Sequence, residues 1–450
     1  MRNIARLDSI ALPMTHHMRQ RGLRVDLDHF AAMERALSDD MDRITEEVRS
    51  MTGRLVNLDS GDQVSELLFK HMGLKQARVK FTKSGDRESV EHEVLVSIQH
   101  EHPVVAKILH FKEFSKLRGT YVVPMPKLAR RVRLGEWRMF PNLGTTRVPS
   151  GRFNCNEPNL LAMPNRTKRG RQVCEGFITD EGWCFVSCDF SQIEPRIVAH
   201  RSQDENLMNV YHNREDIYSD FATDAFQLPD QRYQDETGWH YPSVNKKTHR
   251  FPAKTCILAS IYRVTAVGLL DQMPVVCGRC HTEAHEHSET CPGFVALWNE
   301  PSCQTLINAF YAKYPGITRM QTMDNRRARE FSYIWDDWGR LMHTQAVHSC
   351  HPWVVEAALR EAGNMPVQGG ACGAFKLGMA ECFDWLEREG LLEYCHPLLP
   401  VHDEIVFEAH EAIAQEVGEK TCEIFRNCVQ LSVPIEAEMT TAPVWGKILK

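Results

Sequence analysis

The sequence predicts an α+β protein that combines an antiparallel sheet with large helical regions. Apolar, β-branched and aromatic residues at 183–188, 398–407 and 433–438 predict the strands of this sheet. Apolar side chains at helical spacing dominate residues 1–120 and return after residue 374. With 450 residues, of which 43% are hydrophobic and 25% charged, the chain can form two or three packed globular units.

The first helical region contains three predicted helices. Apolar residues between 30 and 48 keep helical spacing after Asp28, which we expect to cap this helix. A shorter helix at 64–72 should end at Gly73, and a third helix covers residues 104–111.

Basic residues are concentrated in one tract. The net charge of −6 conceals a segment at 127–172 that holds eleven Lys or Arg and two Glu. Such a tract can follow the phosphate backbone of a nucleic acid, although a solvated basic loop has the same composition.

Nothing in the sequence predicts insertion in a membrane. No apolar run reaches the length of a membrane span, and residues 1–26 lack the basic start and apolar core of a signal peptide. The fifteen cysteines show no spacing typical of a disulfide scaffold. We therefore expect a cytoplasmic protein with reduced thiols and no membrane partner.

An acidic residue stands where the first predicted strand ends. Residues 183–188 lead into Asp189, and Pro195 suits the first turn of a following helix. A carboxylate in that place can hold a metal ion against phosphates, or it can simply cap the helix.

A second acidic site interrupts an apolar hairpin. Asp403 and Glu404 stand at the bend of residues 398–407. Turn acids are usually turn formers, but burying two charges here is costly unless a cation compensates. Two acidic strand ends that converge can hold two divalent ions about 3.5–4 Å apart, the arrangement for in-line displacement at phosphorus.

A third stretch carries cations at helical spacing. Arg250, Lys254, Leu258 and Tyr262 recur every four residues, so on a helix they share one face. This face suits a triphosphate at its cationic end and a sugar and base at its apolar end. An ordinary amphipathic helix would show the same spacing.

Together, and in this order, the three stretches resemble the family A DNA polymerases of the bacterial DNA polymerase I type. Residues 188–196 (CDFSQIEPR) are similar to the first palm motif of the family, and 401–404 (VHDE) to its catalytic hairpin. Residues 250–262 resemble its fingers helix, Arg-x3-Lys-x3-Phe-x3-Tyr. Residues 150–154 and 360–369 resemble further family segments, so the resemblance covers nearly the whole chain.

The resemblance implies a right-hand polymerase fold with an antiparallel-sheet palm, a helical thumb and helical fingers. The thumb would cover residues 1–137 and hold the DNA duplex. The palm would comprise 138–200 and 346–450, and its second part would carry the catalytic hairpin. The fingers would cover 201–345, with an insertion at 273–300.

The resemblance also implies the site residues. Two Mg²⁺ ions would be held by Asp189, Asp403 and the Phe190 carbonyl, with Glu404 as a further catalytic residue. Lys254 would protonate the leaving pyrophosphate, and Glu194 would exclude a ribose 2′-hydroxyl. The dNTP would be bound by Gln192, Glu194, Arg250, Lys254, Leu258 and Tyr262. Primer and template would contact Arg152, Asn159, Arg360, Asn364, Gln368 and His402.

Four positions depart from the family pattern. Leu161 stands in place of Gln, Tyr218 in place of His, Leu258 in place of an aromatic residue and Arg263 in place of Gly. We expect the loss of the ring at Leu258 to make nucleotide incorporation slower or more selective.

The insertion carries a second candidate metal site. Cys277 and Cys280 form a Cys-x2-Cys pair, which is followed by His285, His287 and Cys291. The three cysteines and one of the histidines would complete a tetrahedral, structural zinc site. The alternative is a disordered His-rich insertion with chance cysteines.

The expected function is template-directed addition of dNTPs to a primer 3′ end by a monomeric DNA polymerase. No residues precede the thumb that could form a 3′–5′ exonuclease, so we expect proofreading and replication partners to be separate chains. A polymerase-only chain is similar to phage enzymes, which would place it in a bacterial or phage-infected cytoplasm. Two alternatives stay open: a single-subunit RNA polymerase, against which Glu194 argues, and an inactive protein that binds primer–template DNA.

Overall fold

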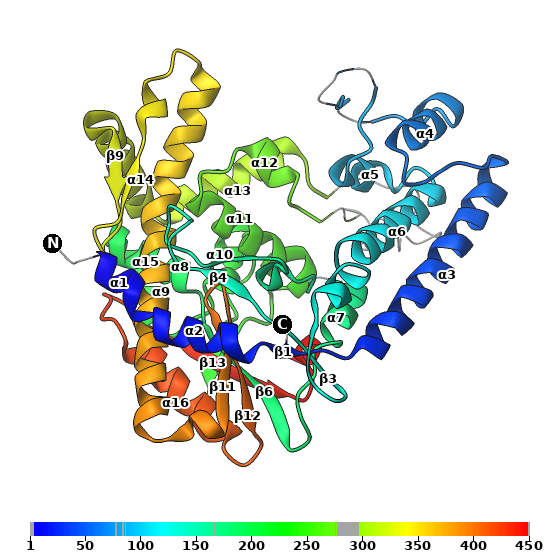
Figure 1. Cartoon of the computed structure of the whole chain (residues 1–450). Coiled ribbons are helices and arrows are strands. Elements are labelled where there is room, and N and C mark those ends of the chain that lie inside the picture. Colours follow the sequence, from blue (N-terminus) through cyan, green and yellow to red (C-terminus); the bar gives the residue numbers. More distant parts are fainter. Residues whose placement is uncertain are drawn as a thin grey trace.

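An antiparallel sheet forms the base of the protein, and helical regions rise from it on two sides (Figure 1). This arrangement is seen in a computed structural model. The residues that the structure describes are 4–76, 79–82, 85, 87–165, 167–274, 276 and 297–448.

The base sheet has four strands in the order β11-β12-β6-β13, all antiparallel. Its strands are β6 (Trp183–Phe190), β11 (Cys395–Val401), β12 (Glu404–His410) and β13 (Ala437–Ala442). The first three confirm the predicted strand and hairpin. The predicted strand at 433–438 is wrong in its bounds, because pairing starts only at Ala437. Pro434 has no N–H to donate to a neighbouring strand, and it precedes that start.

Two helices cover one face of this sheet, α15 (Pro352–Arg388) and α16 (Ala414–Asn427). Phe190 of β6 stacks on Phe425 of α16 with ring centroids 4.3 Å apart, and Phe375 of α15 packs edge-on against Phe425. Since side chains alternate along a strand, Asp189 points to the opposite face, away from these helices.

The helix α15 is longer than the sequence predicts. It runs for 37 residues without interruption and contains Pro366, whereas apolar periodicity predicts a helix only after residue 374. Proline removes one helical hydrogen bond. Here its neighbours Met365 and Val367 are buried, so we attribute the continuity of the helix to tertiary packing.

The N-terminal helical region, residues 27–117, has its own apolar core, which includes Ile44, Val64, Ile108 and Phe111. Its helices are α3 (Leu27–Thr52), α4 (Gly61–Ser65), α5 (His92–Ile98) and α6 (Pro103–Leu117). The predicted cap Asp28 is wrong. Asp26 caps α3 instead, accepting a hydrogen bond from the His29 amide at 3.0 Å.

The segment before α3 packs on the base sheet. The helix α2 lies against β11, and α1 lies against α15. The buried ammonium of Lys376 donates to Asp8 at 2.6 Å, which fastens α1 to α15.

The short elements of this part and of 130–202 are α1 (Ile4–Ile10), α2 (Leu12–Arg21), β1 (Leu23–Arg24), β2 (Arg130–Arg133), β3 (Glu136–Met139), β4 (Asn142–Gly144), β5 (Asn154–Asn156), α7 (Lys168–Cys174) and α8 (Ile193–Ser202).

The central helical region, residues 205–331, stands between the N-terminal region and the start of α15 in Figure 1. It consists of α9 (Glu205–His212), α10 (Ile217–Ala225), β7 (Tyr233–Asp235), β8 (Gly238–His240), α11 (Phe251–Ile261), α12 (Ala266–Leu270), α13 (Glu300–Lys313) and α14 (Pro315–Phe331). A hairpin of β9 (Tyr333–Trp335) and β10 (Leu341–His343) follows. None of the described helices combines the length and the apolar character needed to cross a bilayer.

A stack of rings joins α2 to the far end of the sheet. His396 of β11 lies between Trp183 of β6 and His17 of α2, with ring centroids 5.3 and 5.6 Å away. Burial and the nearby Arg21 lower the pKa of His396 to about 3. The folded protein therefore keeps this ring neutral at pH values where a histidine of the unfolded chain is charged.

We predict that His396 makes the fold sensitive to acid. Between about pH 6.5 and pH 3 the unfolded chain binds a proton here that the folded chain does not, so stability should fall as the pH is lowered through this window. Urea unfolding of the wild type and of His396→Phe measures this effect. When the pH is lowered from about 6.5 to 5, the free energy of unfolding should fall by about 1–2 kcal/mol less in the variant than in the wild type.

The exposed His212 at the end of α9 provides the control. His212→Gln should follow the wild-type curve at every pH. A His396→Phe curve parallel to that of the wild type would contradict the assignment.

Candidate active site

The strand register brings the two predicted catalytic segments together. Glu404 of β12 pairs with Asp189 of β6, so Asp403 lies beside the end of β6. The Phe190 amide donates to the Asp403 carbonyl at 3.3 Å, which fixes the two backbones against each other. The structure thus places Asp189, Phe190, Asp403 and Glu404 at one end of the sheet.

Asp403 sits in a two-residue turn between β11 and β12. The residue before it, His402, has a φ of 60°, which is uncommon for any residue other than glycine. Strain of this kind concentrates where a side chain must be held in a fixed place. Burial and the nearby Glu194 carboxylate raise the pKa of Asp403 to about 6.

Asp189 has an acidic neighbour on each side. Glu438 of β13 pairs with it from the side opposite to Glu404. Sequence reasoning missed Glu438, because only the register shows which residue of β13 meets Asp189. Like charges directly opposite one another destabilise a sheet, and Ser187 offsets part of this by donating to Glu404.

These groups fit a divalent cation of the Mg²⁺ type. Carboxylate and carbonyl oxygens are the ligands that Mg²⁺ prefers, and a cation would stabilise Asp403 in its ionised form. Within the described ranges, no three acidic, histidine or cysteine side chains form a complete metal cage. Mg²⁺ commonly binds through one or two carboxylates together with substrate phosphates, so an incomplete cage suits it.

Four predicted residues from separate segments meet above the acids. The Glu194 carboxylate, on α8, accepts hydrogen bonds from Arg152 and from the hydroxyl of Tyr262 at the end of α11. Gln368 of α15 also lies near Tyr262 and lowers the pKa of its hydroxyl. Burial and the Glu194 carboxylate raise the pKa of Tyr262, so this hydroxyl stays protonated. We call Arg152, Glu194, Tyr262 and Gln368 the Glu194 cluster.

The two predicted phosphate-binding cations lie side by side. Arg250 and Lys254 both stand over the ring of Tyr218, at 5.2 and 5.6 Å from its centroid. Arg250 donates to both oxygens of Asp216, at 2.8 and 3.0 Å. Tyr218, at the position where the family pattern has His, therefore supports this cationic pair.

The other predicted residues are distributed around this centre. Leu258 is partly buried on α11 between Lys254 and Tyr262. Gln192 caps α8, and its side-chain oxygen accepts from Tyr211 at 3.2 Å. The remaining predicted DNA contacts are His402, Asn159, Arg360 and Asn364.

These DNA contacts differ in their surroundings. Arg360 and Asn364 share α15 with Gln368, and the buried Asn364 Oδ1 has no hydrogen-bond partner among the described residues. His402 is exposed at the hairpin turn. Asn159 is exposed as well, and among the described residues its side chain forms no hydrogen bond with the Glu194 cluster.

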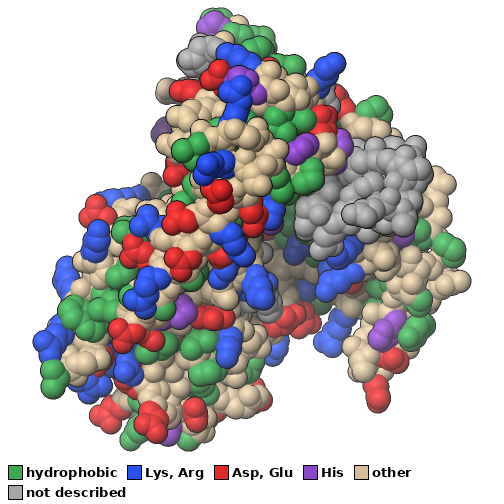
Figure 2. Space-filling model, turned by 90° about the vertical axis from the view of Figure 1, so that its right-hand side faces the viewer, with side chains coloured by type: hydrophobic (Ala, Val, Ile, Leu, Met, Phe, Trp, Pro, Cys, Tyr) green, Lys and Arg blue, Asp and Glu red, His purple; other side chains and the backbone are tan. Residues whose placement is uncertain are grey.

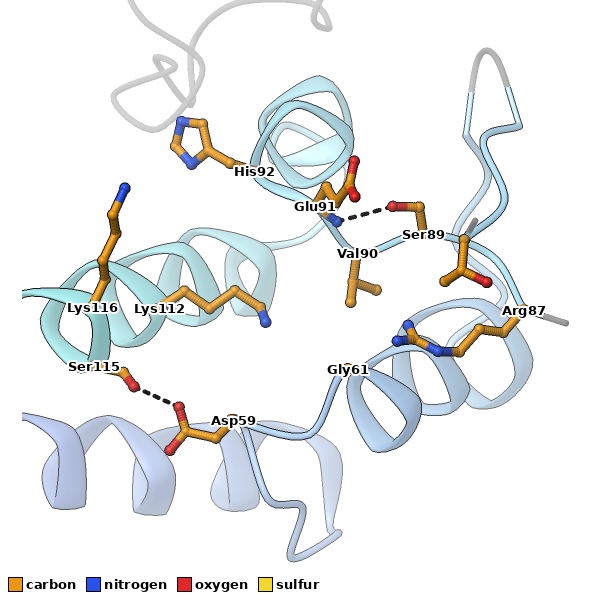
Figure 3. A pocket seen from close by; sticks show the side chains of 11 residues that line it. Asp59, Gly61, Arg87, Ser89, Val90, Glu91, His92, Lys112, Ser115 and Lys116 are labelled. Atoms are coloured by element: carbon orange, nitrogen blue, oxygen red, sulfur yellow. Dashed lines mark hydrogen bonds between the residues drawn. The ribbon is translucent and has the colours of Figure 1, made fainter. Parts of the chain in front are cut away.

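A polar cavity of about 480 Å³ lies in the N-terminal helical region (Figure 3). Its lining includes Arg87, His92, Lys112 and Lys116 together with the acidic Asp59 and Glu91, and Lys112 extends from α6 into it. Burial lowers the pKa of Lys112. Sequence reasoning missed this site, because the four basic residues come from two segments that only the fold brings together. Seen from the side that carries the N-terminal helical region, Lys and Arg side chains gather around a central hollow (Figure 2).

Comparison with known proteins identifies the family. Residues 27–447 match the family model for DNA polymerase family A. The chain belongs to DNA polymerase family A. It is 31% identical over 429 residues to the thermostable DNA polymerase I of Thermus aquaticus, covering 95% of this chain and 46% of that protein. It is 27% identical over 434 residues to DNA polymerase I of Chloroflexus aurantiacus, covering 96% of this chain and 42% of that protein.

A solved structure is similar over nearly the whole of this family A chain. It is the polymerase domain of Pol1 from M. smegmatis in complex with DNA primer-template and dNTP, with a TM-score of 0.82 and 25% identity. The match covers 99% of this chain and 73% of that one, which confirms the predicted right-hand polymerase fold. The family match also favours a DNA polymerase over the RNA polymerase alternative. The chain spans less than half the length of the two relatives named above.

The predicted zinc ligands lie outside the described residues. Cys277, Cys280, His285, His287 and Cys291 all fall within 277–296. The zinc site therefore stays a prediction.

We predict that Lys112 contributes one phosphate contact to DNA binding. Lys112→Ala should weaken binding of a primer–template duplex severalfold and reduce the slope of log affinity against log salt by about 1, because one fewer counterion is released. Fluorescence anisotropy across a salt series measures both quantities.

Lys420→Ala is the matched control, since Lys420 lies on α16, which covers the other face of the sheet. It should leave both quantities unchanged. If the slope of log affinity against log salt is unchanged in Lys112→Ala, the cavity lies outside the DNA interface.

Proposed function

We propose that this chain is a template-directed DNA polymerase that adds dNTPs to the 3′ end of a primer. One observation carries the proposal: segments around Asp189, Tyr262 and Asp403, far apart in the sequence, meet around the carboxylate of Glu194. The structure of the similar Pol1 domain from M. smegmatis is a complex with DNA primer-template and dNTP. This supports the same ligands for the present chain.

Asp189, Asp403 and the Phe190 carbonyl would hold the Mg²⁺ ions, with Glu404 beside them. Bound Mg²⁺ in such a site lowers the pKa of an attacking hydroxyl and neutralises charge on the phosphates. Asp403 must be ionised to act as a ligand, and a pKa of about 6 leaves it ionised at neutral pH. The backbone hydrogen bond between Phe190 and Asp403 keeps the two ligand segments in register.

The triphosphate would lie along the first turns of α11. The planar guanidinium of Arg250 is held in place by Asp216, so it can neutralise phosphate oxygens without a large rearrangement. Lys254 has an exposed ammonium that can donate a proton to the leaving pyrophosphate. Leu258 would pack against the ribose, and Tyr262 would lie near the templating base.

The Glu194 cluster would select the sugar. Arg152 and Tyr262 hold the Glu194 carboxylate from two sides, which fixes its position. A fixed carboxylate leaves no room for a ribose 2′-hydroxyl, so the expected substrate is a deoxynucleotide. Gln192 would complete the nucleotide site at the start of α8.

Primer and template would pass along α15 toward the hairpin turn. Arg360, Asn364 and Gln368 repeat at helical spacing on α15, and His402 would contact the primer terminus. Arg152 would reach the minor groove, where acceptors occur on every base pair. Asn159 would add a contact from the loop after β5.

The domains would follow the right-hand plan. The thumb would be 1–137, although residues 4–21 pack on the base sheet and on α15 rather than on the other thumb helices. The fingers would be 201–345 with the insertion at 273–300, and the palm 138–200 and 346–450.

Primer extension tests the proposal. The wild type with Mg²⁺ should extend a labelled primer on a DNA template with dNTPs and not with rNTPs. Asp403→Asn should reduce the rate about a thousandfold or more, because it removes a charged metal ligand of nearly the same shape.

Asp384→Asn is the matched control, since it makes the same change at an exposed position of α15. It should extend like the wild type. Extension with rNTPs alone would make the chain an RNA polymerase, and tight primer–template binding without any extension would make it a binding protein.

Glu194 provides a separate prediction about the sugar. Glu194→Ala should raise the efficiency of rNTP use relative to dNTP use by about a hundredfold, the usual scale for discrimination of one hydroxyl by shape. Single-nucleotide kcat/KM values for dATP and ATP measure the ratio. Tyr262→Phe keeps Glu194 and should move the ratio less; an unchanged ratio in Glu194→Ala would exclude it as the sugar-selecting residue.

A further inference from the structure

A buried carboxylate in the N-terminal helix α1 holds two cations. Arg340, in the turn between β9 and β10, donates to both oxygens of Asp8, at 3.1 and 2.5 Å. The fully buried ammonium of Lys376 donates to Asp8 at 2.6 Å. Burial alone would raise the pKa of this carboxyl, but the hydrogen bonds from Arg340 and Lys376 keep its pKa below the ordinary value. Asp8 is therefore ionised in the folded protein.

Lys376 connects Asp8 to the loop of residues 145–153, which joins β4 to β5. Its ammonium also donates to the Thr145 carbonyl at 2.9 Å, at the start of this loop. The same ammonium lies 5.3 Å from the ring centroid of Phe153, at the end of the loop. One buried cation thus contacts both ends of the loop.

Arg340 contacts the same loop at Gly151. The two residues are so close that a Cβ at Gly151 would lie 2.5 Å from the guanidinium carbon. Gly151 has a φ of 77°, which glycine adopts easily, and its carbonyl accepts from the buried Cys372 thiol of α15 at 2.9 Å. The backbone just before Arg152 is therefore held by Arg340 and by α15.

Arg152 stands between these two held positions. Gly151 precedes it, Phe153 follows it, and its guanidinium donates to the carboxylate of Glu194 on α8. The Arg152 side chain is itself 37% exposed, so the surrounding protein encloses it only in part. Because a long side chain has many rotamers, its reach to Glu194 depends on where the loop holds its backbone.

We propose that Asp8 is a positioning residue for Arg152 and, through Arg152, for Glu194. The inference rests on the proposed polymerase function, in which Glu194 selects the sugar. Asp8 acts indirectly, since its charge keeps the Arg340 and Lys376 side chains buried against the loop. Without that charge the two buried cations are costly, so both side chains should turn toward solvent and release the loop. Arg152 would then hold Glu194 less firmly, and a ribose would be excluded less strictly.

Substitution of Asp8 tests this series of contacts. Asp8→Asn keeps the shape of the side chain and removes its charge. It should raise kcat/KM for ATP relative to dATP about tenfold, and Arg152→Ala should raise the same ratio at least as much. Asp384→Asn makes the same change at an exposed position of α15 and should leave the ratio unchanged.

A double substitution separates positioning from a general loss of stability. If Asp8 acts through Arg152, the ratio in Asp8→Asn/Arg152→Ala should equal the ratio in Arg152→Ala alone. If the two effects multiply in the double variant, Asp8 acts independently of Arg152 and the proposal is wrong. A ratio in Asp8→Asn within about twofold of the wild type also contradicts it.

Lys376→Met keeps the proposal testable if Asp8→Asn does not fold. Methionine fills a similar volume without a charge, so it removes the contact with Thr145 and leaves the pair of Asp8 and Arg340 in place. The ratio of ATP to dATP use should rise in the same direction, by about threefold. An unchanged ratio would overturn the proposed link between Asp8 and the loop.

A spectroscopic measurement tests the positioning without catalysis. Protein labelled with isotopic arginine should give an Nε–H resonance for Arg152, assigned by its loss in Arg152→Lys. This resonance should shift or broaden in Asp8→Asn and in Lys376→Met, and not in Asp384→Asn. An unchanged resonance in the first two variants overturns the proposal. If the wild type extends no primer, the polymerase function fails, and the resonance still decides whether Asp8 positions Arg152.

Discussion

The pairing of β6 with β12 is the constraint on which the site depends. A shift of one residue would turn Asp189 to the face covered by α15 and α16 and would separate it from Asp403. Packing opposes that shift: Phe190 stacks on Phe425, and Gly418 lets α16 approach so closely that a Cβ there would lie 2.3 Å from Met439. The apolar side of the sheet therefore sets the geometry of its acidic end.

The site combines acidic residues at the end of the sheet with basic residues on the neighbouring helices. Asp189 is flanked in the sheet by Glu404 and Glu438, and burial together with the Glu194 carboxylate raises the pKa of Asp403. Among the basic residues, Arg250 and Lys254 both lie over the ring of Tyr218. Under the proposed function, a nucleotide with bound metal ions would balance both sets of charges at once, whereas either set alone is costly.

Local patterns were sufficient to predict the strand β6, the hairpin of β11 and β12, and the helix α11. Each is a short apolar run or a four-residue repeat, and each contains or borders the polar residues of the proposed site. The sequence-based predictions were wrong where tertiary packing determines the bounds or the cap of an element. They began α15 only after residue 374, began the last strand before Ala437, and chose Asp28 instead of Asp26 as the cap of α3. Glu438, the cavity around Lys112 and the contacts of Asp8 could not be found from local patterns, because each depends on segments distant in the chain.

The length of α15 has a consequence for how the protein unfolds. One continuous helix carries Leu359 and Gln368, which lie near the end of α11, and Phe375, which packs beneath the sheet. Because both regions pack on the same helix, we expect a loss of structure in α15 to disturb both of them. Heat or denaturant should therefore loosen the end of α11 and the base sheet together, and a state that keeps only one of them intact should not accumulate.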